Sequence, residues 1–187
     1  MEIINARAQD APQLKTLFEA AFGSHYLSTE QILDYIRGGT PFKLAVEGDA
    51  LLGAILFIPA GEAEVAAHVH MDPAAVRRLS GGKPCLLCKC ACTADGLQGT
   101  GIGKQILSAC LADIAAGGYG AVFTVLWKYN GAIPAESLFA GFGFVRGRAL
   151  TMPWYQDAGY VCSICKGRCR CDGVVYYKSI EKEGSTE

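Results

Sequence analysis

The residues best suited to chemistry begin at Gln98, in the stretch LQGTGIGKQIL, where glycines at positions 99, 101 and 103 alternate with other residues. An apolar pattern with helical spacing follows, so the glycines lead directly into the N-terminus of a predicted helix. The first N–H groups of a helix have no intrahelical partner and carry partial positive charge, and glycine allows a ligand to approach the backbone closely. The stretch therefore predicts a binding site for an anion such as a diphosphate.

This glycine loop differs from two common nucleotide-binding motifs. A P-loop requires Gly-x4-Gly-Lys-Ser/Thr, but Gln98 replaces the first glycine and Gln105 replaces the hydroxyl residue that binds Mg²⁺. A Rossmann fingerprint requires Gly-x-Gly-x-x-Gly in an early βαβ unit. Here the third glycine comes one residue early and the loop lies in mid-chain. Neither motif therefore describes the ligand of this loop.

Four cysteines near the C-terminus have the spacing of a metal site. Cys162, Cys165, Cys169 and Cys171 form a Cys-x2-Cys-x3-Cys-x-Cys pattern, with a turn at Gly167 between the pairs. Four thiolates so spaced can surround a tetrahedral zinc ion, and the metal would order a segment that has little apolar content. An iron–sulfur cluster, a pair of local disulfides and a hairpin with free thiols are the alternatives.

A second group of cysteines, Cys85, Cys88, Cys90 and Cys92, lies in the apolar segment 83–93. If this segment is a strand, the last three cysteines share one face and the first points to the other. A straight strand cannot fold three alternate thiols around one metal, so we expect these cysteines to be small buried hydrophobes. The alternative for Cys92 is that its thiol accepts an acyl group.

The composition limits the class of protein. The chain has 187 residues, a length that suits one domain, and its formal net charge of −1 gives no broad positive field for nucleic acid. No basic segment followed by an apolar one opens the sequence, and the longest apolar run, 50–60, is too short to span a bilayer as a helix. We therefore expect a cytoplasmic protein that binds neither membranes nor nucleic acid.

The elements that position these residues can be predicted from apolar periodicity, cap residues and turns. Helices are expected at 11–22, 28–38, 72–80, 101–116 and 134–142. Strands are expected at 2–10, 42–47, 50–60, 83–93, 121–129, 144–155 and 173–180, with an irregular segment at 61–71. This order implies one α/β (α+β) domain over 1–187, with a mixed sheet, helices on both faces and a cysteine-rich hairpin insertion at about 156–172.

The glycine loop resembles a known family motif. TADGLQGTGIGKQIL is similar to the acetyl-CoA-binding motif of the GNAT N-acetyltransferase superfamily, Arg/Gln-x-x-Gly-x-Gly/Ala, with Gln98, Gly101 and Gly103 in its fixed positions. WKYNGAIPAESLFAGFGF also resembles the family's later segment, in which a strand ends near an asparagine, here Asn130, and a short helix follows. The resemblance implies the family's mostly antiparallel central sheet.

The resemblance also implies an acetyl-CoA site. In that family the CoA diphosphate lies on the loop amides, the pantetheine arm pairs with the end of the preceding strand, and a backbone N–H polarises the thioester. The matching residues here are Cys92, Thr93, Ala94, Gln98, Gly99, Thr100, Gly101, Ile102, Gly103, Lys104, Asn130 and Phe139. The implied reaction is direct attack of a primary amine, on a small molecule or a peptide, on acetyl-CoA. Many of these folds pair, so a homodimer is compatible with the resemblance.

The catalytic groups depart from the family pattern. Phe139 stands where many members carry a tyrosine that protonates the departing thiolate, and phenylalanine has no such proton. The candidates for the acid are then Ser137, Tyr129 and water. Glu64 is a candidate to take the proton of the amine, although it also fits exposed surface charge. The same applies to its neighbours Glu62, His68 and His70.

Two other functions fit the same residues. A phenylalanine at position 139 also suits a module that binds CoA without catalysis. The cysteines at 162–171 suit a zinc-knuckle protein that docks a partner.

Overall fold

A computed structural model describes residues 1–157 and 159–180; residues 158 and 181–187, which the predicted domain and insertion include, lie outside the described residues. The strands are β1 (Glu2–Asn5), β2 (Gly23–Ser24), β3 (Phe42–Glu47), β4 (Ala50–Ala60), β5 (Cys85–Thr93), β6 (Ala121–Lys128), β7 (Val145–Leu150), β8 (Val161–Cys162) and β9 (Asp172–Ser179). The helices are α1 (Ala11–Phe22), α2 (Thr29–Arg37), α3 (Glu62–Val69), α4 (Pro73–Ser80), α5 (Ile102–Ala116) and α6 (Glu136–Gly141), preceded by a 3₁₀ turn, η1 (Ala8–Asp10).

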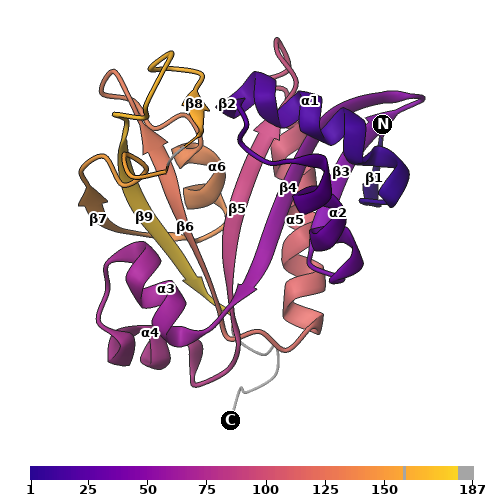
Figure 1. Ribbon diagram of the computed structural model, residues 1–187. Helices are drawn as coiled ribbons and strands as arrows, with labels where there is room; N and C mark the ends of the chain where they lie inside the picture. Colours follow the sequence, from indigo (N-terminus) through magenta and orange to yellow (C-terminus); the bar gives the residue numbers. More distant parts are fainter. Residues whose placement is uncertain (158, 181–187) are drawn as a thin grey trace.

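Seven strands form one sheet in the order β1-β3-β4-β5-β6-β9-β7, and β2 pairs with β8 in a separate two-stranded sheet (Figure 1). Among the described strands, β5 and β6 are the parallel pair, and the other neighbours in the large sheet are antiparallel. The crossover between the parallel strands contains α5, as a parallel pairing requires. The predicted fold class, a mixed and mostly antiparallel sheet, is confirmed.

Helices cover both faces of the sheet (Figure 1). α5 and α6 contribute Ile106 and Phe139 to the buried cluster on one face. α1 and α2 contribute Phe18 and Ile32 to a cluster on the other face, and α4 adds Val76 to a third cluster beside it. Within the described residues, no helix is long and apolar enough to cross a membrane.

Helix α3 lies in segment 61–71, which the sequence reasoning treated as irregular. Val65 and Val69 are buried at helical spacing, but alanines and charged residues surround them, so the apolar pattern is short. The helix begins at Gly61 without a side-chain cap and ends at His70, whose φ of 52° is left-handed. Because neither end carries the usual cap residue, the helix has no clear signal in the sequence.

Several element ends differ from the prediction. β1 stops at Asn5 rather than residue 10, since the chain turns into η1. Asp10 directly precedes α1, but its carboxylate accepts the N–H of Arg7 at 2.8 Å and makes no cap bond to α1. β7 stops at Leu150 rather than residue 155, because turns follow it. Local hydrogen bonds at these ends compete with the regular elements.

The last three cysteines of β5 do not share one face, in contrast to the prediction from strict alternation. Consecutive residues of β4 pair with Cys90 and Cys88, so Lys89 is an extra residue in β5. Such a β-bulge shifts the alternation of side chains by one. Cys88 therefore joins the cluster under α5, whereas Cys90 and Cys92 lie on the α1 side.

Candidate active site

A cleft opens where β5 and β6 separate. Their parallel pairing runs from Cys85–Ala121 to Leu87–Phe123, after which β5 stays paired with β4, and β6 with β9. Beyond this point each of the two strands has an edge that pairs with no described strand. Figure 1 shows the strands diverging, with α6 behind the gap. The cleft between them has a volume of about 1500 Å³.

The glycine loop borders this cleft and leads into α5. Gly99 and Gly101 have φ values of 79° and 89°, a left-handed conformation that favours glycine. The N–H of Gln105 donates to the carbonyl of Gly101 at 3.2 Å, so the N–H groups of residues 102–104 precede the first intrahelical bond. The dipole of this 15-residue helix adds partial positive charge at the same end. The local structure is therefore that of an anion site.

Most residues matched to the acetyl-CoA site line this one cleft. They are Cys92, Thr93, Ala94, Gln98, Gly99, Gly101, Ile102, Gly103, Lys104 and Phe139. Thr100 and Asn130 are not among the described residues that line it. The hydroxyl of Thr100 instead donates to the carbonyl of Leu97 at 2.7 Å, and so holds the turn that presents the glycines.

The conformation of Asn130 has a local explanation. Asn130 and Gly131 have φ values of 50° and 77°. Tyr129 and Ala132, on either side, exchange two backbone hydrogen bonds of 3.0 Å. Asn-Gly is the preferred pair where both central residues of a hairpin turn need positive φ. The turn thus accounts for the asparagine, and its contact with CoA stays a prediction.

Three of the predicted catalytic candidates line the cleft from three parts of the chain, whereas Glu62 and His70 are not among the described residues that line it. Glu64 lies on α3, Ser137 lies on α6, and Tyr129 follows β6. His68, which the sequence offered as a candidate base alongside Glu64, lines the cleft too, one helical turn after Glu64. His70 ends α3.

The surroundings of His68 suit a proton acceptor. His68 remains exposed, but partial desolvation against its neighbours lowers its pKa, and the charge of Lys89 on β5 lowers it further. The charges of Asp157 and Glu64 raise the pKa of His68, and the charge of His70 lowers it. With its pKa below the ordinary 6.5, the imidazole is neutral at pH 7 and can accept a proton from a bound molecule.

Aromatic side chains that the sequence reasoning missed form one wall of the cleft. Ring centroids are 4.5 Å apart for Phe22 and Tyr26, and 5.5 Å apart for Phe22 and Trp127. Tyr160 lies 5.8 Å from Tyr26, and Trp154 lies 6.1 Å from Trp127. Both tryptophans of the chain line this cleft, but no spacing in the sequence connects them with the segments around Phe22 and Tyr160.

Two cleft residues have properties that restrict the chemistry. Burial raises the pKa of Cys92 to about 12, so its thiol stays protonated at neutral pH and is a poor nucleophile. This argues against acyl transfer to Cys92. Phe139 is fully buried and packs edge-on against Phe144, with ring centroids 5.0 Å apart. The position at which the family carries a tyrosine therefore offers packing and no hydroxyl.

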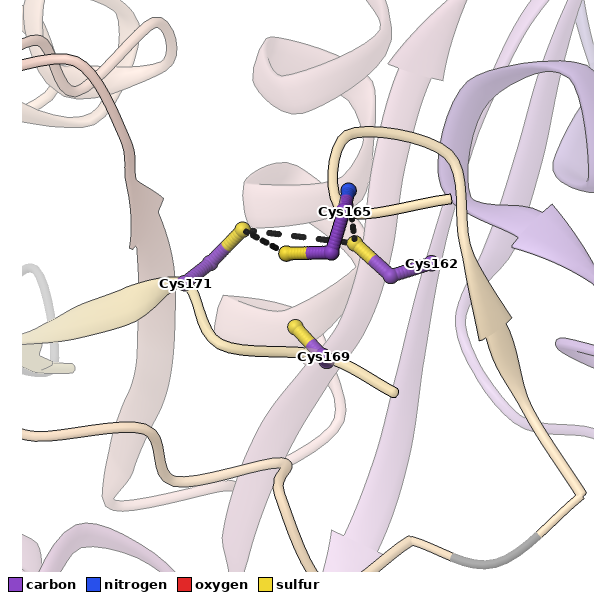
Figure 2. Close-up of side chains that lie close together, drawn as sticks. All are labelled: Cys162, Cys165, Cys169 and Cys171. Carbon is purple, nitrogen blue, oxygen red and sulfur yellow. Dashed lines mark hydrogen bonds between the residues drawn. The ribbon is translucent and has the colours of Figure 1, made fainter. Parts of the chain in front are cut away.

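The four C-terminal cysteines converge on a common centre next to the aromatic wall (Figure 2). Their sulfur atoms all lie within 4.8 Å of one another. The Sγ of Cys171 is 4.0 Å from the Sγ of Cys162 and 3.7 Å from that of Cys165. A tetrahedron with Zn–S bonds of about 2.3 Å has edges of about 3.8 Å, so the group has the dimensions of a tetrahedral thiolate site.

Backbone groups around these cysteines also suit thiolate ligands. The N–H of Cys165 donates to the Sγ of Cys162 at 3.5 Å, and the N–H of Arg170 donates to the Sγ of Cys165 at 3.2 Å. Hydrogen bonds to the charged form of a group favour that form. All nine cysteines are free thiols, so the alternative of local disulfides is not realised. The group could hold a metal ion.

Comparison with known proteins agrees with this architecture. Neither the protein-family models nor the curated proteins gave a match to the sequence. Among solved structures, a ribosomal-protein-alanine N-acetyltransferase from Brucella melitensis aligns over 96% of this chain and 99% of its own, with 17% identity and a TM-score of 0.66. A putative acetyltransferase from Salmonella typhimurium, solved with its cofactor acetyl-CoA, aligns over 100% and 97%, with 13% identity and a TM-score of 0.67.

A third structure has a different activity. A GNAT-like decarboxylase in complex with isobutyryl-CoA aligns over 97% of this chain and 100% of its own, with 19% identity and a TM-score of 0.69. At such identities the similarity establishes the fold and leaves the reaction to the residues of the site. The chain therefore has the GNAT fold over nearly its full length, with a cysteine cluster near its C-terminus.

Proposed function

We propose that the protein is an acyl-CoA-dependent N-acyltransferase that transfers the acetyl group of acetyl-CoA to a primary amine. The observation that carries the proposal is the shared cleft. The open edge of β5, the glycine loop and the N-terminus of α5 all border it. A diphosphate fits the loop, and an amide-containing arm fits a strand edge with unpaired backbone groups.

The cofactor would lie along the cleft from the glycine loop to the gap between β5 and β6. Its diphosphate accepts hydrogen bonds from the backbone N–H groups of residues 98–104, and the pantetheine arm runs along β5 at residues 92–94. The thioester then lies between the diverging strands, near the bulge at Lys89. A backbone N–H on β5 donates to the thioester carbonyl and stabilises the oxyanion that forms during attack.

The transfer step needs one proton acceptor and one proton donor. The amine nitrogen attacks the thioester carbonyl carbon, the C–S bond breaks, and the electron pair leaves on the CoA sulfur. His68 takes the proton of the amine, with Glu64 one turn away on α3 to stabilise the imidazolium. Tyr129, Ser137 or water returns a proton to the thiolate, since Phe139 cannot.

We also propose that Cys162, Cys165, Cys169 and Cys171 hold a structural zinc ion. The sulfur positions and the N–H groups directed at them support this choice. Four protein thiolates close the coordination sphere and leave no position for a substrate, so the ion would act on the structure and not on the reaction.

The test is a transfer assay with acetyl-CoA and four amines: ethanolamine, spermidine, free lysine and an alanine-initiated peptide. Mass spectrometry of the amine and chromatography of the released CoA give the balance of the reaction. One acetylated amine per CoA released supports the proposal. Binding of acetyl-CoA without turnover would support the CoA-binding module that Phe139 favours, and loss of CO₂ from an acyl-CoA would indicate a decarboxylase.

A further inference from the structure

The cysteine cluster is tied to the end of α1, which is far from it in sequence. Cys162 lies in β8, which pairs with β2 directly after α1. The N–H of Ser163 donates to the carbonyl of Phe22 at 2.8 Å, and its hydroxyl donates to the carbonyl of Ala21 at 2.9 Å. The hydroxyl of Tyr160 donates to the same Phe22 carbonyl at 2.9 Å. These hydrogen bonds, together with the pairing of β2 and β8, join the two segments; we call this junction the seam.

The seam depends on a very close approach of two backbones. A Cβ atom built at Gly23 would lie 1.9 Å from the carbonyl oxygen of Val161 and 2.7 Å from the N of Ser163. The φ of Gly23 is 124°, which also favours glycine. Any side chain at this position would force β2 and β8 apart.

The same segments line the cleft on the side away from α5. Phe22 and Tyr26, which follow from α1, pack in the cluster on the sheet face opposite α5. Tyr160, Ser163 and Ile164, from the cysteine segment, also line the cleft. We call Phe22, Tyr26, Tyr160, Ser163 and Ile164 the front wall. The glycine loop and α5 border the cleft from the other side, so the cofactor and the acceptor would enter from opposite faces.

Phe22 and Tyr26 of the front wall pack on the buried cluster around Phe18, but the cysteine segment has little apolar support of its own. In the buried cluster of this segment, the fully buried members are Cys162, Cys169 and Cys171, and the aromatic neighbours are only partly buried. Four unligated thiols in so small a cluster would leave the segment weakly held. A metal bound by all four thiolates would join the two ends of the cysteine segment and stabilise it in place of a hydrophobic core.

We propose that the metal at the four cysteines fixes the front wall, so that zinc controls acceptor binding and leaves acetyl-CoA binding unchanged. The assignment of the front wall to the acceptor rests on the proposed function, whereas the dependence of its order on the metal does not. The ion takes no part in the transfer step.

The first test compares Cys165→Ser with Cys85→Ser, a matched thiol substitution outside the cluster. Zinc content is measured by elemental analysis, acetyl-CoA affinity by calorimetry, and order by hydrogen–deuterium exchange at β2 and β8. Fluorescence of the chain's two tryptophans, both in contact with the cluster, reports on the same wall. We expect Cys165→Ser alone to lose zinc, change the tryptophan spectrum and raise exchange at Ser24 and Ser163 on the order of tenfold or more.

The second test separates the effect of losing the metal from the effect of disrupting the pairing of β2 with β8. Gly23→Ala leaves all four cysteines in place but opposes the pairing of β2 with β8. Its control is Gly61→Ala, because a Cβ at Gly61 meets nothing within 4 Å. We expect Gly23→Ala to keep its zinc and its acetyl-CoA affinity, while transfer to the four amines of the panel falls on the order of tenfold.

The outcomes distinguish the two proposals. Protein purified with zinc available that contains no zinc, or exchange at β2 and β8 that is the same with and without zinc, would overturn the inference while the transferase stands. Zinc-loaded protein that does not bind acetyl-CoA would overturn the proposed function, and with it the role of the front wall in acceptor binding.

Discussion

At the scale of single residues, the glycines of the loop are required for different reasons. Gly99 and Gly101 adopt left-handed φ values, with open space where a side chain would be. Gly103 has no such φ, but a Cβ there would lie 3.3 Å from Cδ2 of Leu138 on α6. The first two therefore serve the shape of the loop and access to its amides, and the third serves the approach of α5 to α6.

A substitution at Gly101 tests the phosphate role of the loop. Gly101→Leu would distort the loop and put a side chain where a diphosphate should lie. We expect acetyl-CoA affinity to fall at least about tenfold, or about 1.4 kcal/mol, by calorimetry. Gly39→Leu is the control, since Gly39 has a φ of 64° and equally open space but lies outside the set of cleft residues. Equal losses of affinity in both variants would show that backbone strain, and not the loop, causes the effect.

The pKa of His68 leads to a prediction about pH. Partial desolvation lowers the folded-state pKa of His68 below 6.5, so the imidazole keeps its free electron pair at neutral pH and loses it only as the pH falls through that lower value. The kcat/KM of acetyl transfer should therefore decline on the acid side with an apparent pKa below 6.5.

The variant His68→Gln provides the test of that assignment. We expect kcat to fall on the order of a hundredfold, and the acid limb of the profile to disappear. Glu62→Gln, on the same helix but outside the set of cleft residues, should behave like the unmodified protein. An unchanged acid limb in His68→Gln would assign the proton to another group.

At the scale of elements, the point where β5 and β6 separate decides where the cleft begins. A Cβ built at Gly120, just before β6, would lie 1.9 Å from the carbonyl oxygen of Ser80 at the end of α4. The N–H of Gly120 also donates to the carbonyl of Pro84 at 2.9 Å, directly before β5. These contacts hold the start of β6 against β5 and α4.

Gly120→Ala should disturb this junction. We expect the free energy of unfolding to fall by about 1–3 kcal/mol, measured by urea denaturation, because the backbone of α4 cannot yield easily. Gly61→Ala, at an open position, should change it by less than about 0.5 kcal/mol. A Gly120→Ala protein as stable as the parent would mean that α4 and β6 can separate without cost.

The elements also show how far sequence reasoning reaches. The apolar stripe of α5, with Ile102, Ile106, Cys110 and Ile114, follows the helical period and is buried as predicted. The helix expected from residue 28 also forms, and Ser28 and Gln31 make the bonds of a capping box at its start. The bulge in β5 was not, because a bulge depends on the pairing with β4 and leaves no mark in the residue alternation. α3 was missed for a similar reason, as its uncapped ends depend on packing.

At the scale of the whole molecule, the fold determines where the cleft lies, and the side chains that line it determine the reaction. The GNAT fold brings the glycine loop, α3 and α6 to one cleft. The positions of the loop and α6 could be predicted from the loop motif and the order of elements, whereas α3 was missed. The aromatic wall could not be predicted, since it joins segments that are distant in sequence. His68 was one of four candidates for the base, and the sequence alone could not separate them. Structures of the same fold include acetyltransferases and a decarboxylase, so the reaction depends on these side chains.

The most direct test of the central claim is calorimetric titration of the folded, zinc-loaded protein with acetyl-CoA, with ATP and NAD as controls. The account predicts saturable binding of one acetyl-CoA per chain, at least about tenfold tighter than either nucleotide. Absence of acetyl-CoA binding, or equal binding of ATP and NAD, would contradict the claim that the glycine loop and the open edge of β5 form a CoA site.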